Sequence, residues 1–148
     1  MKKISIITIV LLVFLSGCRY EEGPFINFKK VDKRIRGMWD VSTVYKNGKQ
    51  SDIEFPTEVE SLRAQFRFHN NGVLIITYIQ NNIIVQSSGS WDFGEKKKTL
   101  NVAFKNQYTN TYREYEILKF KSQELKLRFT DENDVEWMLV FSLYYSMP

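Results

Sequence analysis

Eight stretches of this 148-residue chain alternate apolar and polar side chains with a period of two, and no other feature limits its possible folds as much. The clearest is Leu62–His69, where Leu, Ala, Phe and Phe alternate with Arg, Gln, Arg and His. Successive side chains of a strand point to opposite faces, so one face of such a segment meets a core and the other meets water. From Ile35 onwards no stretch shows a convincing helical period of 3.6 residues. The sequence therefore predicts an all-β domain.

Short polar connections separate these stretches, and Asn47-Gly48 is a dipeptide that adopts the positive φ angles of a tight turn. The other predicted strands are Ile35–Tyr45, Val73–Gln80, Ile83–Phe93, Leu100–Phe104, Tyr112–Phe120, Leu125–Phe129 and Val135–Tyr145. We expect an eight-stranded antiparallel up-and-down meander closed into a barrel, since closure removes unpaired strand edges. An open sandwich of the same strands is the main alternative. Gly89 in mid-strand and a slip of parity between Ile117 and Leu118 predict bulges or bends.

The start of the chain reads as an export signal. Lys2 and Lys3 precede an apolar run, Ile4–Leu15. The run leads into Leu15-Ser16-Gly17-Cys18, and Cys18 is the only cysteine of the chain. An uncleaved transmembrane helix is the alternative, but a bilayer span needs about 20 apolar residues. Leu-Ser-Gly-Cys resembles the lipobox of bacterial lipoproteins, in which the cysteine receives acyl chains such as palmitate and becomes the new N-terminus.

That resemblance implies a lipoprotein signal peptide over residues 1–17, lipidation of Cys18, a tether over residues 18–34 and a folded domain over residues 35–148. It also implies anchoring in the cell envelope at the outer membrane, on the periplasmic face or on the cell surface. Without the two lysines of the signal, the net charge falls from +4 to about +2. A nearly neutral domain does not favour nucleic acid as a partner.

A second resemblance begins at Gly37-Met38-Trp39, which opens the first predicted strand. It resembles the Gly-x-Trp motif of the lipocalins, whose tryptophan packs across the closed end of a barrel. Phe66–Phe68 before an Asn-Gly turn, Trp91, and Tyr115–Phe120 leading to Glu124–Leu127 follow in order. Together these segments resemble the lipocalin-like lipoproteins of Bacteroidota. The family implies a barrel with a ligand-binding or binding-module role.

The residues needed for catalysis are scarce. His69 is the only histidine and Cys18 the only cysteine, which cannot build the common zinc sites. Glu114 and Glu116 share one strand face, about 7 Å apart by strand rise, but Tyr115 on the opposite face is expected to point inward. We therefore expect both carboxylates to lie in water. The sequence predicts no enzyme, no catalytic residue, no metal site and no cofactor.

The inward aromatic face is the remaining candidate for a binding site. Its members are Trp39, Phe66, Phe68, Trp91, Phe104, Tyr115, Phe129, Trp137 and Phe141. Such a face can bind an apolar or flat ligand, and it can equally be plain core. We expect a packed closed end near Trp39 and a shallow cavity, if any, at the other end.

Two functions follow from this reading. The first is a membrane-anchored protein that binds a small apolar ligand in or at the barrel. The second is a structural or interaction subunit of a cell-envelope complex that docks through its outer face. Tyr78, Tyr112 and Tyr144 are predicted to be exposed and to mark such a docking surface.

Overall fold

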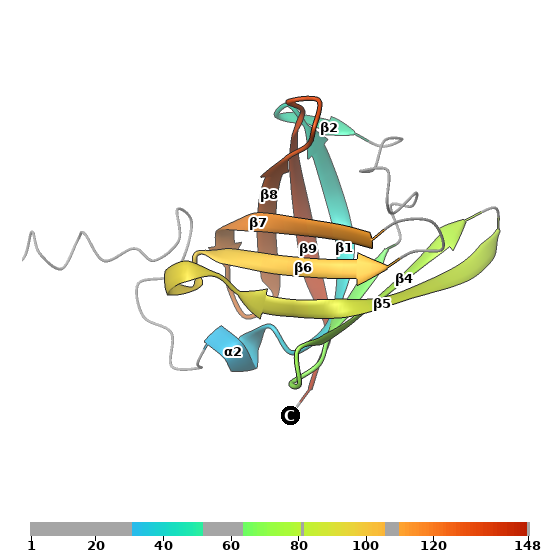
Figure 1. Ribbon diagram of the computed structural model, residues 1–148, viewed down its shortest axis with the longest axis vertical. Helices are drawn as coiled ribbons and strands as arrows, with labels where there is room; N and C mark the ends of the chain where they lie inside the picture. The colour runs from blue at the N-terminus through green and yellow to red at the C-terminus, as the bar shows by residue number, and fades with distance from the viewer. Residues whose placement is uncertain (1–30, 52–63, 81, 106–109, 148) are drawn as a thin grey trace, which may run out of the picture.

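The computed structural model describes residues 31–51, 64–80, 82–105 and 110–147 of the chain. Its elements are α2 (Val31–Arg34), β1 (Gly37–Lys46), β2 (Lys49–Ser51), β3 (Gln65–Phe68), β4 (Val73–Gln80), β5 (Ile83–Phe93), the 3₁₀ helix η1 (Glu95–Lys97), β6 (Thr99–Lys105), β7 (Asn110–Phe120), β8 (Glu124–Thr130) and β9 (Glu136–Ser146) (Figure 1). The predicted signal peptide and Cys18 lie outside the described residues. Within these residues, no helix has the length and apolar character that crossing a membrane requires.

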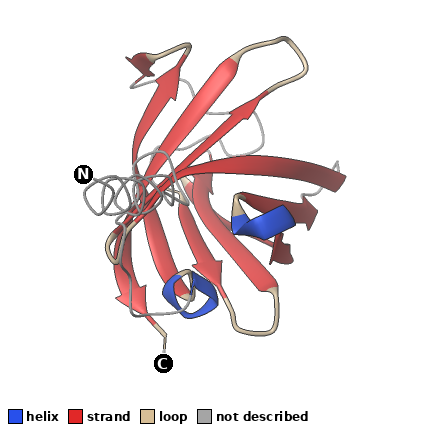
Figure 2. Ribbon diagram, turned by 90° about the vertical axis from the view of Figure 1, so that its left-hand side faces the viewer, coloured by secondary structure: helices blue, strands red, loops and turns tan. Residues whose placement is uncertain are grey.

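The strands form one antiparallel sheet in the order β2-β1-β3-β4-β5-β6-β7-β8-β9, and β1 also pairs with β9. That last pairing closes the sheet into an eight-stranded barrel, with β2 as a short extra strand at its rim (Figure 2). The predicted all-β barrel is confirmed, and the open sandwich is excluded because β1 joins the two ends of the meander. Closure leaves the apolar face of every strand pointing into one enclosed core.

Several local expectations hold. Strands β4 and β5 have the predicted bounds, Val73–Gln80 and Ile83–Phe93. At Gly89 the pairing of β5 with β4 and β6 is regular, so no bulge is present there, and a Cβ at this position would collide with the carbonyl oxygen of Ala103. The predicted slip of parity in β7 is a register shift between Ile117 and Lys119. This irregularity lets a long strand follow the curved wall of the barrel.

The inner face of the first strand is a correction. The sequence predicts that Thr43 and Tyr45 point inward, in phase with Val41. A register shift between Val41 and Thr43 in the β1–β9 pairing reverses the alternation. Val44 is therefore the fully buried residue, and Thr43 and Tyr45 are half-buried. The sequence analysis also missed β2, which folds back on β1 after the expected Asn47-Gly48 turn.

The orientation of β4 decides another expectation. This strand is apolar on both faces, and the structure turns Leu74, Ile76 and Tyr78 into the barrel. The expectation that Tyr78 is exposed is wrong, because only 6% of its surface is accessible. Tyr112 and Tyr144 are confirmed on the outer surface, 69% and 71% exposed.

One end of the barrel is plugged, as the Gly-x-Trp resemblance implies. The last four residues of the segment assigned to the tether, Val31–Arg34, form α2 and cover this end (Figure 1). The indole Nε1 of Trp39 donates a hydrogen bond of 2.8 Å to the carbonyl oxygen of Ile35. The Arg34 guanidinium donates to the carbonyl oxygen of Phe120 at 2.7 Å and lies 4.6 Å from its ring centroid. We call this the closed end, and the opposite end the mouth.

Candidate ligand-binding site

The structure places every aromatic residue of the predicted inner face inside the barrel. The buried residues are Trp39, Phe66, Phe68, Trp91, Phe104, Tyr115, Phe129, Trp137 and Phe141. They divide by height along the barrel axis into a group near the closed end and a group near the mouth. The two groups differ in what surrounds them.

The rings nearer the closed end pack against one another. Phe66 meets Phe141 edge-on with centroids 5.1 Å apart, and Phe68 meets Trp91 edge-on at 5.6 Å. The indole of Trp91 donates a hydrogen bond of 3.1 Å to the carbonyl oxygen of His69, so its one polar atom is satisfied. Rings in edge-to-face contact at these distances fill the space between strands. This half of the barrel is core, and it supports the fold rather than a ligand.

The rings nearer the mouth have polar neighbours. Tyr115 and Phe129 meet edge-on at 5.2 Å, and the guanidinium carbon of Arg113 lies 4.0 Å from the Phe129 ring centroid. Arg113 points inward because the β6–β7 register pairs it with the inward residue Val102. The sequence analysis missed this arginine. The alternation of Thr111, Arg113 and Tyr115 along one strand was the signal that could have found it.

Trp137 forms a second aromatic wall of the mouth. Its indole Nε1 donates a hydrogen bond of 2.9 Å to the carboxylate of Asp131, in the turn between β8 and β9. The Lys46 ammonium lies 5.5 Å from the Trp137 ring centroid. These contacts fix the position of the indole at the mouth end of β9.

The same hydrogen bond controls the acidity of Asp131. The indole of Trp137 lowers the pKa of Asp131 below its ordinary value of 3.8. Partial burial opposes that change, whereas the backbone N–H groups of Val135 and Asn133 and the positive charge of Arg113 lower the pKa further. The carboxylate therefore stays ionised at neutral pH and holds the β8–β9 turn together.

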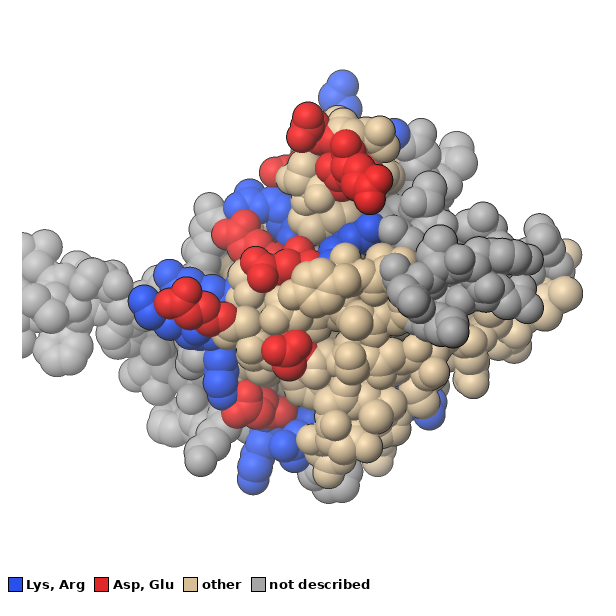
Figure 3. All heavy atoms as spheres, viewed as in Figure 1, with Lys and Arg blue, Asp and Glu red and all other residues tan. Residues whose placement is uncertain are grey.

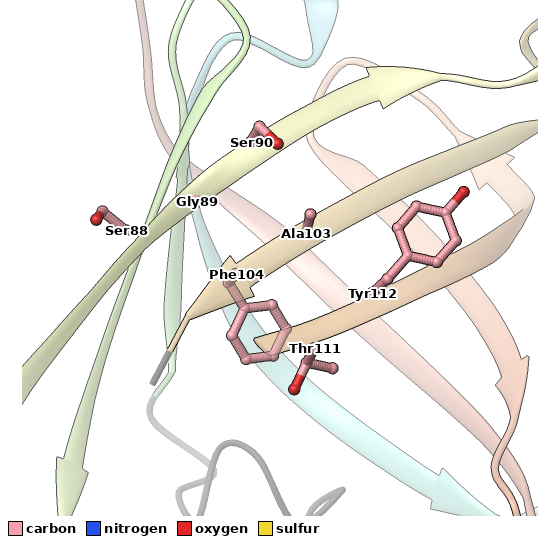
Figure 4. Close-up of a pocket in the computed structure, with 7 residues that line it drawn as sticks. All are labelled: Ser88, Gly89, Ser90, Ala103, Phe104, Thr111 and Tyr112. Carbon is pink, nitrogen blue, oxygen red and sulfur yellow. The ribbon is translucent and has the colours of Figure 1, made fainter. Parts of the chain in front are cut away.

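A shallow hollow of about 340 Å³ lies on β5, β6 and β7 near the mouth (Figure 4). It lies at a fork, because β5 begins at Ile83 but pairs with β6 only from Ser88 onwards. Its lining comes from β5, β6 and β7: Ser88, Gly89, Ser90, Ala103, Phe104, Thr111 and Tyr112. Phe104 and Thr111, which are paired across β6 and β7, are its members from the inner face.

The side chains that could perform acid–base chemistry lie outside the barrel. Glu114 and Glu116 are exposed, as expected, and Glu116 accepts hydrogen bonds of 2.6 and 3.0 Å from Arg128. His69 lies beside the β3–β4 turn, where its backbone N–H donates to Val73. Within residues 31–51, 64–80, 82–105 and 110–147, no three His, Cys, Asp or Glu side chains are grouped to hold a metal ion. The interior offers aromatic surface rather than reactive groups.

Comparison with known proteins gives a fold. No family model and no characterised sequence relative matches the chain. Among solved structures, insecticyanin from the tobacco hornworm Manduca sexta superposes with a TM-score of 0.57 at 9% identity, over 79% of this chain and 65% of that one. The odorant-binding protein OBP1 superposes with a TM-score of 0.51 at 14% identity, over 82% of this chain and 79% of that one. The chain thus has the lipocalin-like fold.

Proposed function

We propose that this chain is a non-enzymatic protein that binds a small apolar ligand at the mouth of its barrel. One observation carries the proposal. The barrel is plugged at one end by α2, Arg34 and Trp39, whereas inward positions at the other end are only half-buried above an aromatic wall. A concave apolar surface with a few polar groups at its rim is the usual form of a small-molecule site.

The mouth supplies both parts of such a site. Phe104, Phe129 and Trp137 line it with rings that are only 5–6% exposed, while the half-buried Thr111 and Arg113 place a hydroxyl and a guanidinium at the rim. The ligand would lie against the rings and enter beside the turn between β8 and β9. Structural likeness to a protein named for binding odorants supports a small molecule as the ligand.

Titration with a fluorescent apolar probe tests this site. Thr111 points inward beside Phe104, so a Thr111→Trp side chain would fill the mouth. We expect it to weaken binding of the probe by about tenfold or more, which corresponds to roughly 1.4 kcal/mol. Ser122→Trp, on the exposed β7–β8 turn at the closed end, is the matched control and should bind as the natural chain does. Equal binding by both variants would exclude the mouth as the site.

Native mass spectrometry of the chain purified from the cells that make it supplies an independent test. A small molecule carried through purification by the natural chain, and lost from Thr111→Trp, would identify the ligand directly. A spectrum that shows only the bare chain, together with no probe binding at any concentration, would contradict the proposal.

We also propose that the barrel is tethered to the outer membrane through acyl chains on Cys18. The order of basic residues, short apolar run, small residues and unique cysteine supports this address. Incorporation of labelled palmitate into the natural chain, and none into Cys18→Ala, is the expected result. Labelling of both chains would show that the lipid is attached to another residue, and labelling of neither chain would contradict the proposed lipid anchor.

Docking to another envelope protein is the second candidate function. The exposed rings of Tyr112 and Tyr144 favour it, since large aromatic side chains are enriched where proteins meet. Simultaneous replacement of both rings by Ser should release a bound envelope protein without changing binding of the apolar probe. Loss of the probe without release of a protein would favour the ligand-binding function alone.

A further inference from the structure

Among the described residues, one edge of β5 is partly unpaired. Its residues 83–90 pair with β4 on one side, but β6 pairs on the other side only from Ser88 to Phe93. Across the described ranges, no strand pairs with Ile83–Ser87 on the side away from β4. The β4–β5 hairpin therefore extends beyond β6 as an arm beside the mouth (Figure 1). We propose that two copies of this chain pair through this edge, strand to strand.

Within the described residues, this edge carries none of the devices that keep strand edges apart. Monomeric proteins protect an open edge with charged side chains, proline or a covering segment. Between Arg67 and Asp92 the sequence holds no Asp, Glu, Lys, Arg or Pro. Ile83 and Ile84 are 66% and 70% exposed beside the open backbone. Figure 3 shows a broad uncharged area where β5 and β6 cross the visible face.

The backbone favours a strand over a lipid surface as the occupant. An exposed apolar hairpin tip could also dip into a bilayer, and both occupants would cover Ile83 and Ile84. Hydrocarbon, however, cannot satisfy the N–H and C=O groups of an open edge. An added strand satisfies these groups with main-chain hydrogen bonds. The edge residues of both copies are uncharged, so antiparallel pairing about a twofold axis brings no like charges together.

The open stretch defines the register of this pairing. Its middle residue is Val85, and an antiparallel twofold there places Val85 of one copy opposite Val85 of the other. Ile84 then lies opposite Gln86, and Ile83 lies opposite Ser87. The next pair brings Asn82 of the second copy to Ser88, at the edge of the hollow beside β6. The fork between β5 and β6 thus limits the pairing to these five residues.

Charge exchange at one cross-strand pair tests the register. Two differently tagged full-length chains are produced together and purified in mild detergent through one tag. We expect the natural chains to co-purify, and Ile84→Lys or Gln86→Glu in both copies to reduce recovery of the second tag about tenfold. The double variant should restore recovery, because each Lys then faces a Glu of the other copy. Both side chains are exposed, so folding is preserved and circular dichroism checks it.

A cysteine at the proposed axis gives an independent test. In a full-length Cys18→Ser chain, Val85→Cys should form a disulfide-linked dimer under mild oxidation, since opposed residues of antiparallel strands bring their Cβ atoms close. Ser122→Cys at the closed end is the matched control and should form no disulfide-linked dimer. Absence of the linked dimer, or co-purification that persists in Ile84→Lys, would overturn the proposal. If the natural chain does not co-purify but binds liposomes, and Ile84→Lys loses that binding, the arm would be assigned to a membrane instead.

Discussion

The guanidinium carbon of Arg113 lies 4.0 Å from the centroid of the Phe129 ring, inside the mouth of the barrel. An arginine at that height separates two environments: a closed stack of rings below it and a half-exposed rim above it. Tyr115 supports Phe129 from the side, with ring centroids 5.2 Å apart. The guanidinium therefore covers one face of the Phe129 ring at the mouth end of the barrel.

Replacement of Arg113 by Ala should lower the free energy of unfolding by about 0.5–1 kcal/mol, the usual value of a half-exposed cation–π contact. Urea unfolding at neutral pH measures it, and Lys121→Ala on the exposed β7–β8 turn serves as the control. A loss several times larger would show that Arg113 holds the mouth together rather than covering one ring.

Phe68 is fully buried between Phe66 and Trp91, and its removal should leave a cavity in the closed half. We expect Phe68→Ala to lower the free energy of unfolding by roughly 3–5 kcal/mol. Tyr144→Ala removes a ring of similar size from the outer surface and should change stability little. Equal thermal melting of the two variants would contradict the inward orientation of β3.

Gly89→Ala tests the fork between β5 and β6. The added Cβ would meet the carbonyl oxygen of Ala103 and the Cα of Phe104, so the strands must move apart. Overpacking of this kind costs about 1–3 kcal/mol in thermal or chemical unfolding. Ser90 is the next residue of the strand and is exposed, so Ser90→Ala should have the same melting temperature as the natural chain. A neutral Gly89→Ala would mean that the two strands are not held together at this point.

Asp131 predicts an acid-dependent loss of stability. Because the Trp137 hydrogen bond lowers its pKa below 3.8, the folded state favours the carboxylate. Its contribution is present above the ordinary pKa and is lost as the pH falls through the lowered pKa. We expect Asp131→Asn to be less stable than the natural chain at neutral pH, with a difference that shrinks below pH 3.8. Glu132→Gln in the same turn is the control, and a pH-independent difference would contradict this role.

Arg34 closes the plugged end through its hydrogen bond to Phe120 and its stacking on that ring. Arg34→Ala leaves a buried carbonyl oxygen without this donor and should cost about 1–3 kcal/mol in urea unfolding. Lys33→Ala, on the exposed side of α2, should have little effect. Similar losses in both variants would show that α2 contributes through its backbone alone.

Much of this fold could be predicted because strand alternation is a local property. The bounds of β4 and β5, the turn at Asn47-Gly48 and the bulge after Ile117 all follow from residues within a few positions of one another. The closed barrel follows from their number and order, since eight short-linked strands can remove their open edges only by joining the first to the last.

The sequence could not predict which face of β4 is buried, because both of its faces are apolar. Nor could it predict that Val44 replaces Thr43 and Tyr45 in the core, since the responsible register shift arises against β9, far along the chain. The inward direction of Arg113 could have been predicted from its parity with Tyr115, but its partners could not. Phe129 and Asp131 come from β8 and from the turn that follows β8.

The amino-acid sequence by itself determined the strands, their order and the set of rings that must leave water, because alternation and apolar burial act between near neighbours. Only the tertiary structure decided which rings pack against one another near the closed end, which lie beside charged side chains near the mouth, and which edge is left without a strand among the described residues. Those outcomes depend on register and on contacts between distant segments, which no local pattern encodes.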